Sequence, residues 1–144
     1  MNKITNNNSN SSIENRSDFA RIKEALVSDE RNSEYTRRGI MPIYQVDTAA
    51  QILIIGQAPG AKVEENGIPF MDKSGENLRD WMGVDEATFY SKKIAIMPMD
   101  FYFPGKGKTG DLPPRKFIAE EYHEKLLALM PNVKLIPFPK GYSI

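Results

Sequence analysis

The sequence predicts an α/β protein built around a parallel sheet, because strand-like and helix-like patterns alternate along the chain. Two runs of aliphatic residues, at 52–55 and 94–97, have the composition and length of strands that are buried on both faces. Helical patterns follow both runs, and this alternation favours parallel pairing through right-handed crossovers. With 144 residues, the chain is long enough for one domain that buries its own core.

The N-terminal part of the sequence divides into a polar tail and a first helix. Residues 1–16 are rich in Asn and Ser and contain few apolar side chains, so we expect a disordered tail. Ser17 is a suitable N-cap for a helix over 18–27, in which apolar residues recur on one face. The folded domain is therefore expected to occupy residues 17–144.

The middle of the chain contains a loop, the first central strand and a second helix. Pro42 argues against a central strand at 40–46, which we expect to be a connecting loop that leads to the strand at 52–55. Ser74 can cap the second helix, and Gly83 is a typical C-terminal stop. The apolar face of this helix is expected to consist of Leu78, Trp81 and Met82.

The C-terminal half continues the alternation of helices and strands. A short helical turn is expected at 85–90, followed by the second strand at 94–97. The segment 101–114 is rich in Gly, Pro and Lys and is long enough to be a functional loop. An amphipathic helix and a third strand at 133–136 follow. The apolar positions of that helix are Ile118, Tyr122, Leu126, Leu129 and Met130.

Composition excludes several classes of site and partner. The chain has no cysteine, which excludes disulfides, thiolate zinc sites, cysteine nucleophiles and cysteine-ligated iron–sulfur clusters. Lys plus Arg and Asp plus Glu number 19 each, so contact with nucleic acid would require a local basic patch. The sequence contains no signal peptide or membrane-length apolar run. We expect a cytoplasmic monomer without membrane or metal partners.

The turn after the first strand is the first candidate site, because ligands of open α/β sheets bind outside the carboxyl ends of the strands. It reads Gly56-Gln57-Ala58-Pro59-Gly60. The glycines permit close backbone approach, and the proline stiffens the turn, so its N–H groups could face a planar ligand. The spacing does not match a dinucleotide fingerprint or a P-loop. A tight connection that binds no ligand is the alternative.

A longer pattern gives this turn a family resemblance. In order, the chain contains Gly56-Gln57-Ala58-Pro59-Gly60, Glu64 and Glu65, Gly67-Ile68-Pro69-Phe70, and Ser74-Gly75. Without a gap, the series resembles the iron–sulfur branch of the uracil-DNA glycosylases. The similarity to a bacterial group of uracil-DNA glycosylase family proteins extends from about residue 52 to residue 132. It implies a three-layer α/β/α sandwich and hydrolysis of the N-glycosidic bond of a flipped-out base such as uracil in DNA.

The resemblance also implies roles for individual residues. Gln57 and Ala58 would be catalytic, and the base would be bound by Gly56, Pro59, Gly60, Pro69 and Phe70. Phe70 would stack on the base, with a role as an ordinary core residue as the alternative. Gln57 would orient the base or a water molecule, unless it is a solvated turn residue. The adjacent carboxylates Glu64 and Glu65 are assigned no chemistry.

The loop after the second strand supplies candidate DNA contacts. Its basic residues are Lys106, Lys108 and Arg115, which are suited to phosphate binding, although a solvated loop is the alternative. The aromatic residues at 101–103 could line the pocket or pack in the core. His123, the only histidine, is expected at the surface or in packing rather than in catalysis.

Several departures from the family pattern bear on function. Without cysteine the chain cannot hold the four-cysteine cluster of the similar branch, so no cofactor is expected. Residues 97–99 lack the Asn that reads uracil in several branches, which leaves the excised base open. The sequence ends before the family's fourth strand and His-Pro loop, so we expect a C-terminally truncated domain. The alternatives are an inactive remnant or base-binding module, and a structural protein in which the Gly-Pro turn serves packing alone.

Overall fold

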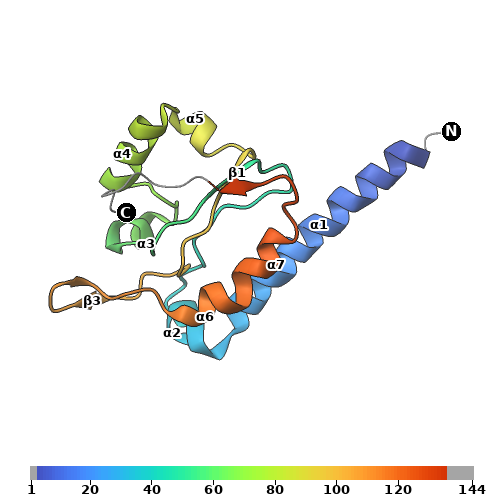
Figure 1. Cartoon of the computed structure of the whole chain (residues 1–144). Coiled ribbons are helices and arrows are strands. Elements are labelled where there is room, and N and C mark those ends of the chain that lie inside the picture. Colours follow the sequence, from blue (N-terminus) through green and yellow to red (C-terminus); the bar gives the residue numbers. More distant parts are fainter. Residues whose placement is uncertain (1–2, 136–144) are drawn as a thin grey trace.

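The protein, seen in a computed structural model, is described for residues 3–135 and for the side chains of residues 16–134, and it is built around a small parallel sheet (Figure 1). The three strands of the sheet are β1 (Ile52–Ile54), β2 (Ile94–Ile96) and β5 (Lys134–Leu135). Their order is β2-β1-β5, with β1 parallel to both neighbours. The predicted α/β class, the parallel pairing and the central place of the first strand are confirmed.

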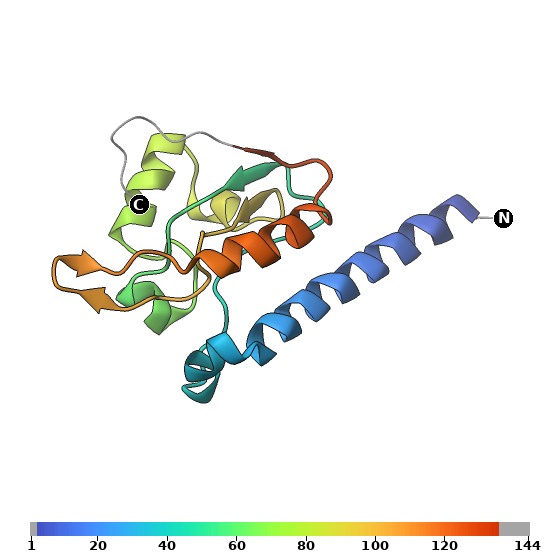
Figure 2. The same ribbon diagram turned by 60° about the horizontal axis from the view of Figure 1, so that its bottom comes forward.

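One face of the sheet packs against the N-terminal and C-terminal helices. The helices on this side are α1 (Lys3–Ser28), α6 (Lys116–Ile118), the π-helical turn η2 (Ala119–His123) and α7 (Glu124–Leu127). Leu53 of β1 and Ala95 of β2 meet Leu26 of α1 and Leu126 of α7 in one buried cluster. Figures 1 and 2 show α1 and α7 side by side. The predicted periodicity of residues 118–130 therefore marks a core face, except that Leu127 rather than Leu129 packs against the cluster.

The opposite face of the sheet packs against a second pair of helices. These are α4 (Lys73–Met82) and α5 (Glu86–Phe89), which lie together in Figure 1. Ile54 and Ile96 of the sheet pack with Leu78 and Phe89 in a second buried cluster. Because successive strand residues point to opposite faces, Leu53 and Ile54 enter different clusters, which is why the aliphatic run is continuous.

Helix α1 is longer than the sequence predicts. Residues 3–16, expected to be a disordered tail, are helical, and Ser17 lies inside α1 rather than at its N-cap. The packed part of α1 provides a helical nucleus, and each further residue then adds one backbone hydrogen bond at low cost. The N-terminal turns of α1 extend away from the rest of the molecule in both views (Figure 2). No helix within residues 3–135 has the length and apolar character needed to cross a bilayer.

The ends and the buried face of α4 differ in detail from prediction. Asp72 rather than Ser74 is the N-cap, and its side chain accepts a hydrogen bond from the N–H of Gly75. Gly83 ends the helix in the left-handed conformation, as predicted. Trp81 is 47% exposed, whereas Arg79 is only 7% exposed. Arg79 is buried because its side chain donates a hydrogen bond to the main chain of the loop before α4.

The segment between α2 (Ser33–Arg37) and β1 covers the outer edge of β2. It contains neither helix nor extended strand, in agreement with the prediction from Pro42. Gln45 forms an isolated antiparallel bridge with Ile96, with hydrogen bonds of 2.8 and 2.7 Å between their main chains. The side-chain amide of Gln45 also donates to the carbonyl oxygens of Phe89 and Ile94. This segment thus acts as a short fourth partner of the sheet.

The predicted loop at 101–114 contains a β-hairpin. Its strands are β3 (Lys106–Gly107) and β4 (Gly110–Asp111), which pair antiparallel and are exposed. The hairpin begins and ends beside a buried ion pair between Asp100 and Arg115, with 2.9 Å between Oδ2 and Nε. It is therefore an ordered projection with a fixed base (Figure 1).

Candidate functional site

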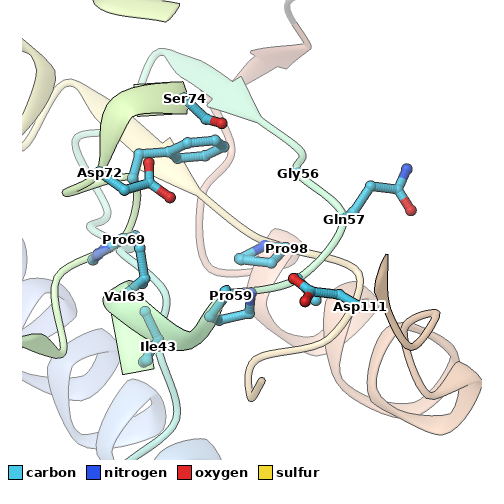
Figure 3. A pocket seen from close by; sticks show the side chains of 13 residues that line it. Ile43, Gly56, Gln57, Pro59, Val63, Pro69, Asp72, Ser74, Pro98 and Asp111 are labelled. Atoms are coloured by element: carbon cyan, nitrogen blue, oxygen red, sulfur yellow. The ribbon is translucent and has the colours of Figure 1, made fainter. Parts of the chain in front are cut away.

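A cavity of about 150 Å³ lies at the carboxyl end of β1, next to the exit of β2 (Figure 3). It is lined by Ile43, Gly56, Gln57, Ala58, Pro59, Gly60, Val63, Pro69, Phe70, Asp72, Ser74, Pro98 and Asp111. Every residue that the sequence predicts for catalysis or base binding is in this set. An apolar cavity of similar volume holds one benzene ring, so the space is suited to a single six-membered ring.

The turn at 56–60 is held by the exit of β2. The carbonyl oxygen of Gly56 accepts a hydrogen bond from the N–H of Met99 at 2.9 Å, and that of Gln57 accepts from Asp100 at 3.0 Å. The helix α3 (Ala61–Asn66) follows the turn directly. With these two carbonyl groups committed, the N–H groups of Gln57 and Ala58 are main-chain groups of the turn that could contact a ligand.

Phe70 has an unusual backbone conformation and is held between two glycines. Its φ is 59°, the only positive value among non-glycine residues that the structure describes. A Cβ on Gly56 would lie 2.9 Å from Cζ of Phe70, and one on Gly75 would lie 1.6 Å from its carbonyl oxygen. The ring contacts Phe89 edge to face at a centroid distance of 6.1 Å. Strained backbone of this kind occurs preferentially at functional sites.

The main chain of the loop at Pro69 and Phe70 is held by hydrogen bonds from Arg79 and Tyr90. Nη1 of Arg79 donates to the carbonyl oxygen of Phe70 at 3.2 Å, and the Tyr90 hydroxyl donates to that of Pro69 at 2.7 Å. Nη1 of Arg79 also reaches the Tyr90 hydroxyl. Burial raises the pKa of Tyr90, which keeps its hydroxyl a donor. Sequence patterns did not indicate this support, because a lone arginine in an amphipathic helix is usually solvated.

The side chain of Gln57 does not enter the cavity. It is exposed and points away from the cavity in Figure 3. Its contribution to the lining therefore comes largely from the part of the residue near the main chain. The side chain of Gln57 therefore has the position expected of a solvated turn residue. Its neighbours Ala58, Pro59 and Gly60 form part of the cavity wall.

The cavity is also lined by two carboxylates that the sequence patterns did not predict. Asp72 and Asp111 lie on opposite sides of the cavity, with Pro98 between them in Figure 3. Asp72 is the N-cap of α4, and its Oδ1 is 2.9 Å from the amide nitrogen of Gly75. Its spacing before that glycine is a local signal that could have been found. Asp111 belongs to the hairpin and has no such signal.

The basic residues predicted to contact DNA occupy different environments. Lys106 and Lys108 are exposed on the hairpin. Arg115 instead forms a forked pair with the fully buried carboxylate of Asp100, through Nε at 2.9 Å and Nη2 at 3.0 Å. Its guanidinium also lies over the rings of Tyr35 and Phe117. The geometry of Arg115 is that of a structural residue rather than a free phosphate ligand.

The aromatic residues and the histidine that follow β2 belong mainly to the core. Phe101 and Tyr102 are fully buried, so the core alternative applies to both. His123 is 9% exposed and stacks on Phe101 with 5.6 Å between ring centroids. Its Nε2 is 2.8 Å from the carbonyl oxygen of Pro98, a lining residue. His123 thus packs behind the wall of the cavity, outside the cavity itself.

The stability of the protein is expected to depend on pH through His123. Burial lowers the pKa of the imidazole below its usual value of 6.5. The unfolded chain therefore binds a proton more readily, and the stability that His123 contributes is lost as the pH falls below about 6.5. Thermal unfolding of wild type and His123→Gln should show a smaller loss in the variant between about pH 7 and about pH 5. Equal losses would contradict this role.

The remaining acidic candidates show no arrangement for metal chemistry. Glu64 lies on α3 rather than in a loop, and it pairs with Arg38 at 2.7 Å with its side chain 13% exposed. Glu64 is therefore an ion-paired and largely buried carboxylate. Within the part of the chain that the structure describes, no three His, Asp or Glu side chains gather as a metal-binding group.

Fold and cavity together define an α/β protein with a ring-sized site at the carboxyl end of its central parallel strand. A family model described as the uracil DNA glycosylase superfamily matches residues 43–139, a range that includes every residue lining the cavity. The chain belongs to this superfamily, and the resemblance predicted from the Gly-Pro turn and Phe70 is confirmed.

Proposed function

We propose that this protein is a DNA glycosylase that hydrolyses the N-glycosidic bond of a flipped-out base such as uracil. The observation that carries the proposal is a cavity of about 150 Å³ lined by the residues to which the family resemblance assigns base binding. An enzyme of this kind must take its target out of the base stack and hold it flat. A cavity for one ring, next to an aromatic side chain, can receive an extruded base and hold it flat.

Phe70 is the proposed stacking platform. Its ring is half-buried, and Gly56 allows that ring to lie directly against the turn. The hydrogen bonds from Arg79 and Tyr90 hold the main chain of the loop, so the ring need not be ordered when a base arrives. Preorganisation of this kind lowers the entropic cost of binding. Pro59, Gly60 and Pro69 complete the proposed base-binding wall.

Gln57 and Ala58 are proposed to act through the turn that they form. Their N–H groups are suited to hydrogen-bond the oxygen atoms of a base and the negative charge that develops on it as the bond breaks. The side chain of Gln57 is exposed, so we assign it less of the catalytic effect than the main chain. Replacement of this side chain should therefore have a smaller effect than replacement of Phe70.

The DNA backbone is proposed to contact the exposed hairpin. Lys106 and Lys108 are available to phosphates, whereas Arg115 contributes by fixing the base of the hairpin through Asp100. Each phosphate contact releases counterions and makes binding sensitive to salt.

As part of the same proposal, the helices on the two faces of the sheet correspond to the three-layer sandwich of the superfamily.

Base release from deoxyuridine-containing oligonucleotides tests this function. Wild type, Gln57→Ala and Phe70→Ala should be compared on single-stranded and duplex substrates, with Trp81→Ala as an exposed aromatic control. We expect Phe70→Ala to reduce release by about tenfold or more, since base–aromatic stacking contributes about 1–3 kcal/mol. Gln57→Ala should lose less, and Trp81→Ala should match wild type.

The same assay separates the possible failures. Release that is unchanged in Phe70→Ala would contradict the stacking role of Phe70, and the glycosylase function would still stand. Absence of release by folded wild type on every substrate would contradict the glycosylase, and binding of uracil under those conditions would indicate a base-binding module.

A further inference from the structure

We infer that Asp111, on the hairpin, is the general base that activates water in the cavity. This inference rests on the proposed glycosylase function and deepens it. The turn after β1 does not supply a carboxylate, because Gln57 occupies the second position of the turn and its side chain points away from the cavity (Figure 3). A carboxylate that faces the cavity must therefore come from elsewhere in the chain.

Of the two carboxylates that line the cavity, only Asp111 is uncommitted. Asp72 uses Oδ1 to cap α4, at 2.9 Å from the amide nitrogen of Gly75. Asp111 forms no ion pair or side-chain hydrogen bond with any other residue that the structure describes. A carboxylate without a fixed partner is able to accept a proton without breaking an existing interaction.

The hairpin holds Asp111 against the wall of the cavity. Oδ2 of Asp111 lies 3.8 Å from the position that a Cβ on Gly60 would occupy, which places the carboxylate beside the turn at 56–60. Lys106 pairs with Asp111 across the hairpin, and the N–H of Leu112 donates to Gly105 at 2.8 Å. At its base the Asp100–Arg115 ion pair joins both ends of the hairpin. Positioned groups of this kind are what a general base requires.

The hydrolysis balances with water as the only co-reactant. The oxygen of water bonds to C1′ of the deoxyribose as the bond from C1′ to the base nitrogen breaks. The electron pair of that bond leaves with the base. Asp111 accepts one proton from the water and returns it to solvent, and the departing base takes up a proton. The products are the free base and an abasic sugar.

The test combines two Asp111 variants with a matched control. Asp111→Asn keeps the shape of the side chain but cannot accept the proton, and Asp80→Asn changes an exposed aspartate outside the cavity. We expect Asp111→Asn to bind deoxyuridine oligonucleotides as wild type does and to release base about 100-fold more slowly. Asp80→Asn should retain the wild-type rate, and circular dichroism should show all variants folded.

Rescue by an external carboxylate separates a general base from a structural role. Sodium formate should restore part of the rate of Asp111→Ala and leave wild type unchanged. A wild-type rate in Asp111→Asn, or no response of Asp111→Ala to formate, would overturn the assignment of Asp111 while the glycosylase function stands. Absence of release by wild type itself would overturn the glycosylase function, and with it this role.

Discussion

Replacement of Gly75 by alanine is expected to cause the largest loss of stability of any single methyl addition at the site. The new Cβ would lie 1.6 Å from the carbonyl oxygen of Phe70 and 2.6 Å from its carbonyl carbon. Because these are backbone atoms, the clash cannot be relieved by a side-chain rotation. We expect the free energy of unfolding, measured in urea, to fall by about 3 kcal/mol or more.

Gly60→Ala is the matched control for this prediction. Its Cβ would meet only Oδ2 of Asp111 at 3.8 Å, which is an ordinary contact. The control should therefore lose less than about 1 kcal/mol. A loss in Gly75→Ala as small as in the control would show that the loop before α4 can shift freely, which would also remove the argument that Phe70 is preorganised.

Arg115→Met is expected to have the second-largest effect. The substitution leaves the carboxylate of Asp100, which is 0% exposed, without its charged partner. Removal of one partner of a buried ion pair typically costs about 3–5 kcal/mol. Two main-chain N–H groups, of Tyr102 and Arg115, still donate to this carboxylate, and the Arg115 side chain is 25% exposed. We therefore expect the lower end of that range in urea unfolding.

Two further variants test whether the charge of Asp100 causes that loss. In the Arg115→Met background, Asp100→Asn removes the unpaired charge and should cost less than it does in wild type. The neighbouring exposed Lys116→Met should change stability by less than about 0.5 kcal/mol. A double variant whose losses simply add would indicate that the ion pair contributes little.

The parts of the fold and site that were predicted correctly depend on short stretches of sequence. The run at 52–55 and the spacing from Gly56 to Phe70 are local patterns. The structure confirms a strand at Ile52–Ile54, and the superfamily match confirms the family resemblance of the spacing. Gly83 also ends its helix for a local reason, since a left-handed residue there favours glycine. Patterns of this kind need no knowledge of distant contacts.

The parts that were missed depend on contacts between distant residues. Arg115 looked like a mobile basic residue because its partner Asp100 is fifteen positions away and carries no signal of burial. Trp81 rather than Arg79 was predicted on the buried face of α4, because apolar periodicity cannot reveal the hydrogen bond from Arg79 to the carbonyl oxygen of Phe70. Asp111 enters the cavity only through the shape of the hairpin. Tertiary structure decides these three cases, and single-sequence propensity cannot.

The bridge between Gln45 and Ile96 has a consequence for behaviour at high concentration. A strand edge with unpaired main-chain groups is a template for addition of another chain and for aggregation. Gln45 occupies this edge of β2 through its main chain and through its side-chain amide, which reaches the carbonyl oxygen of Ile94. Strand β2, which is buried along its length, is thereby closed to intermolecular pairing on that side. The segment that contains Gln45 is thus expected to oppose aggregation through this edge, in addition to extending the sheet.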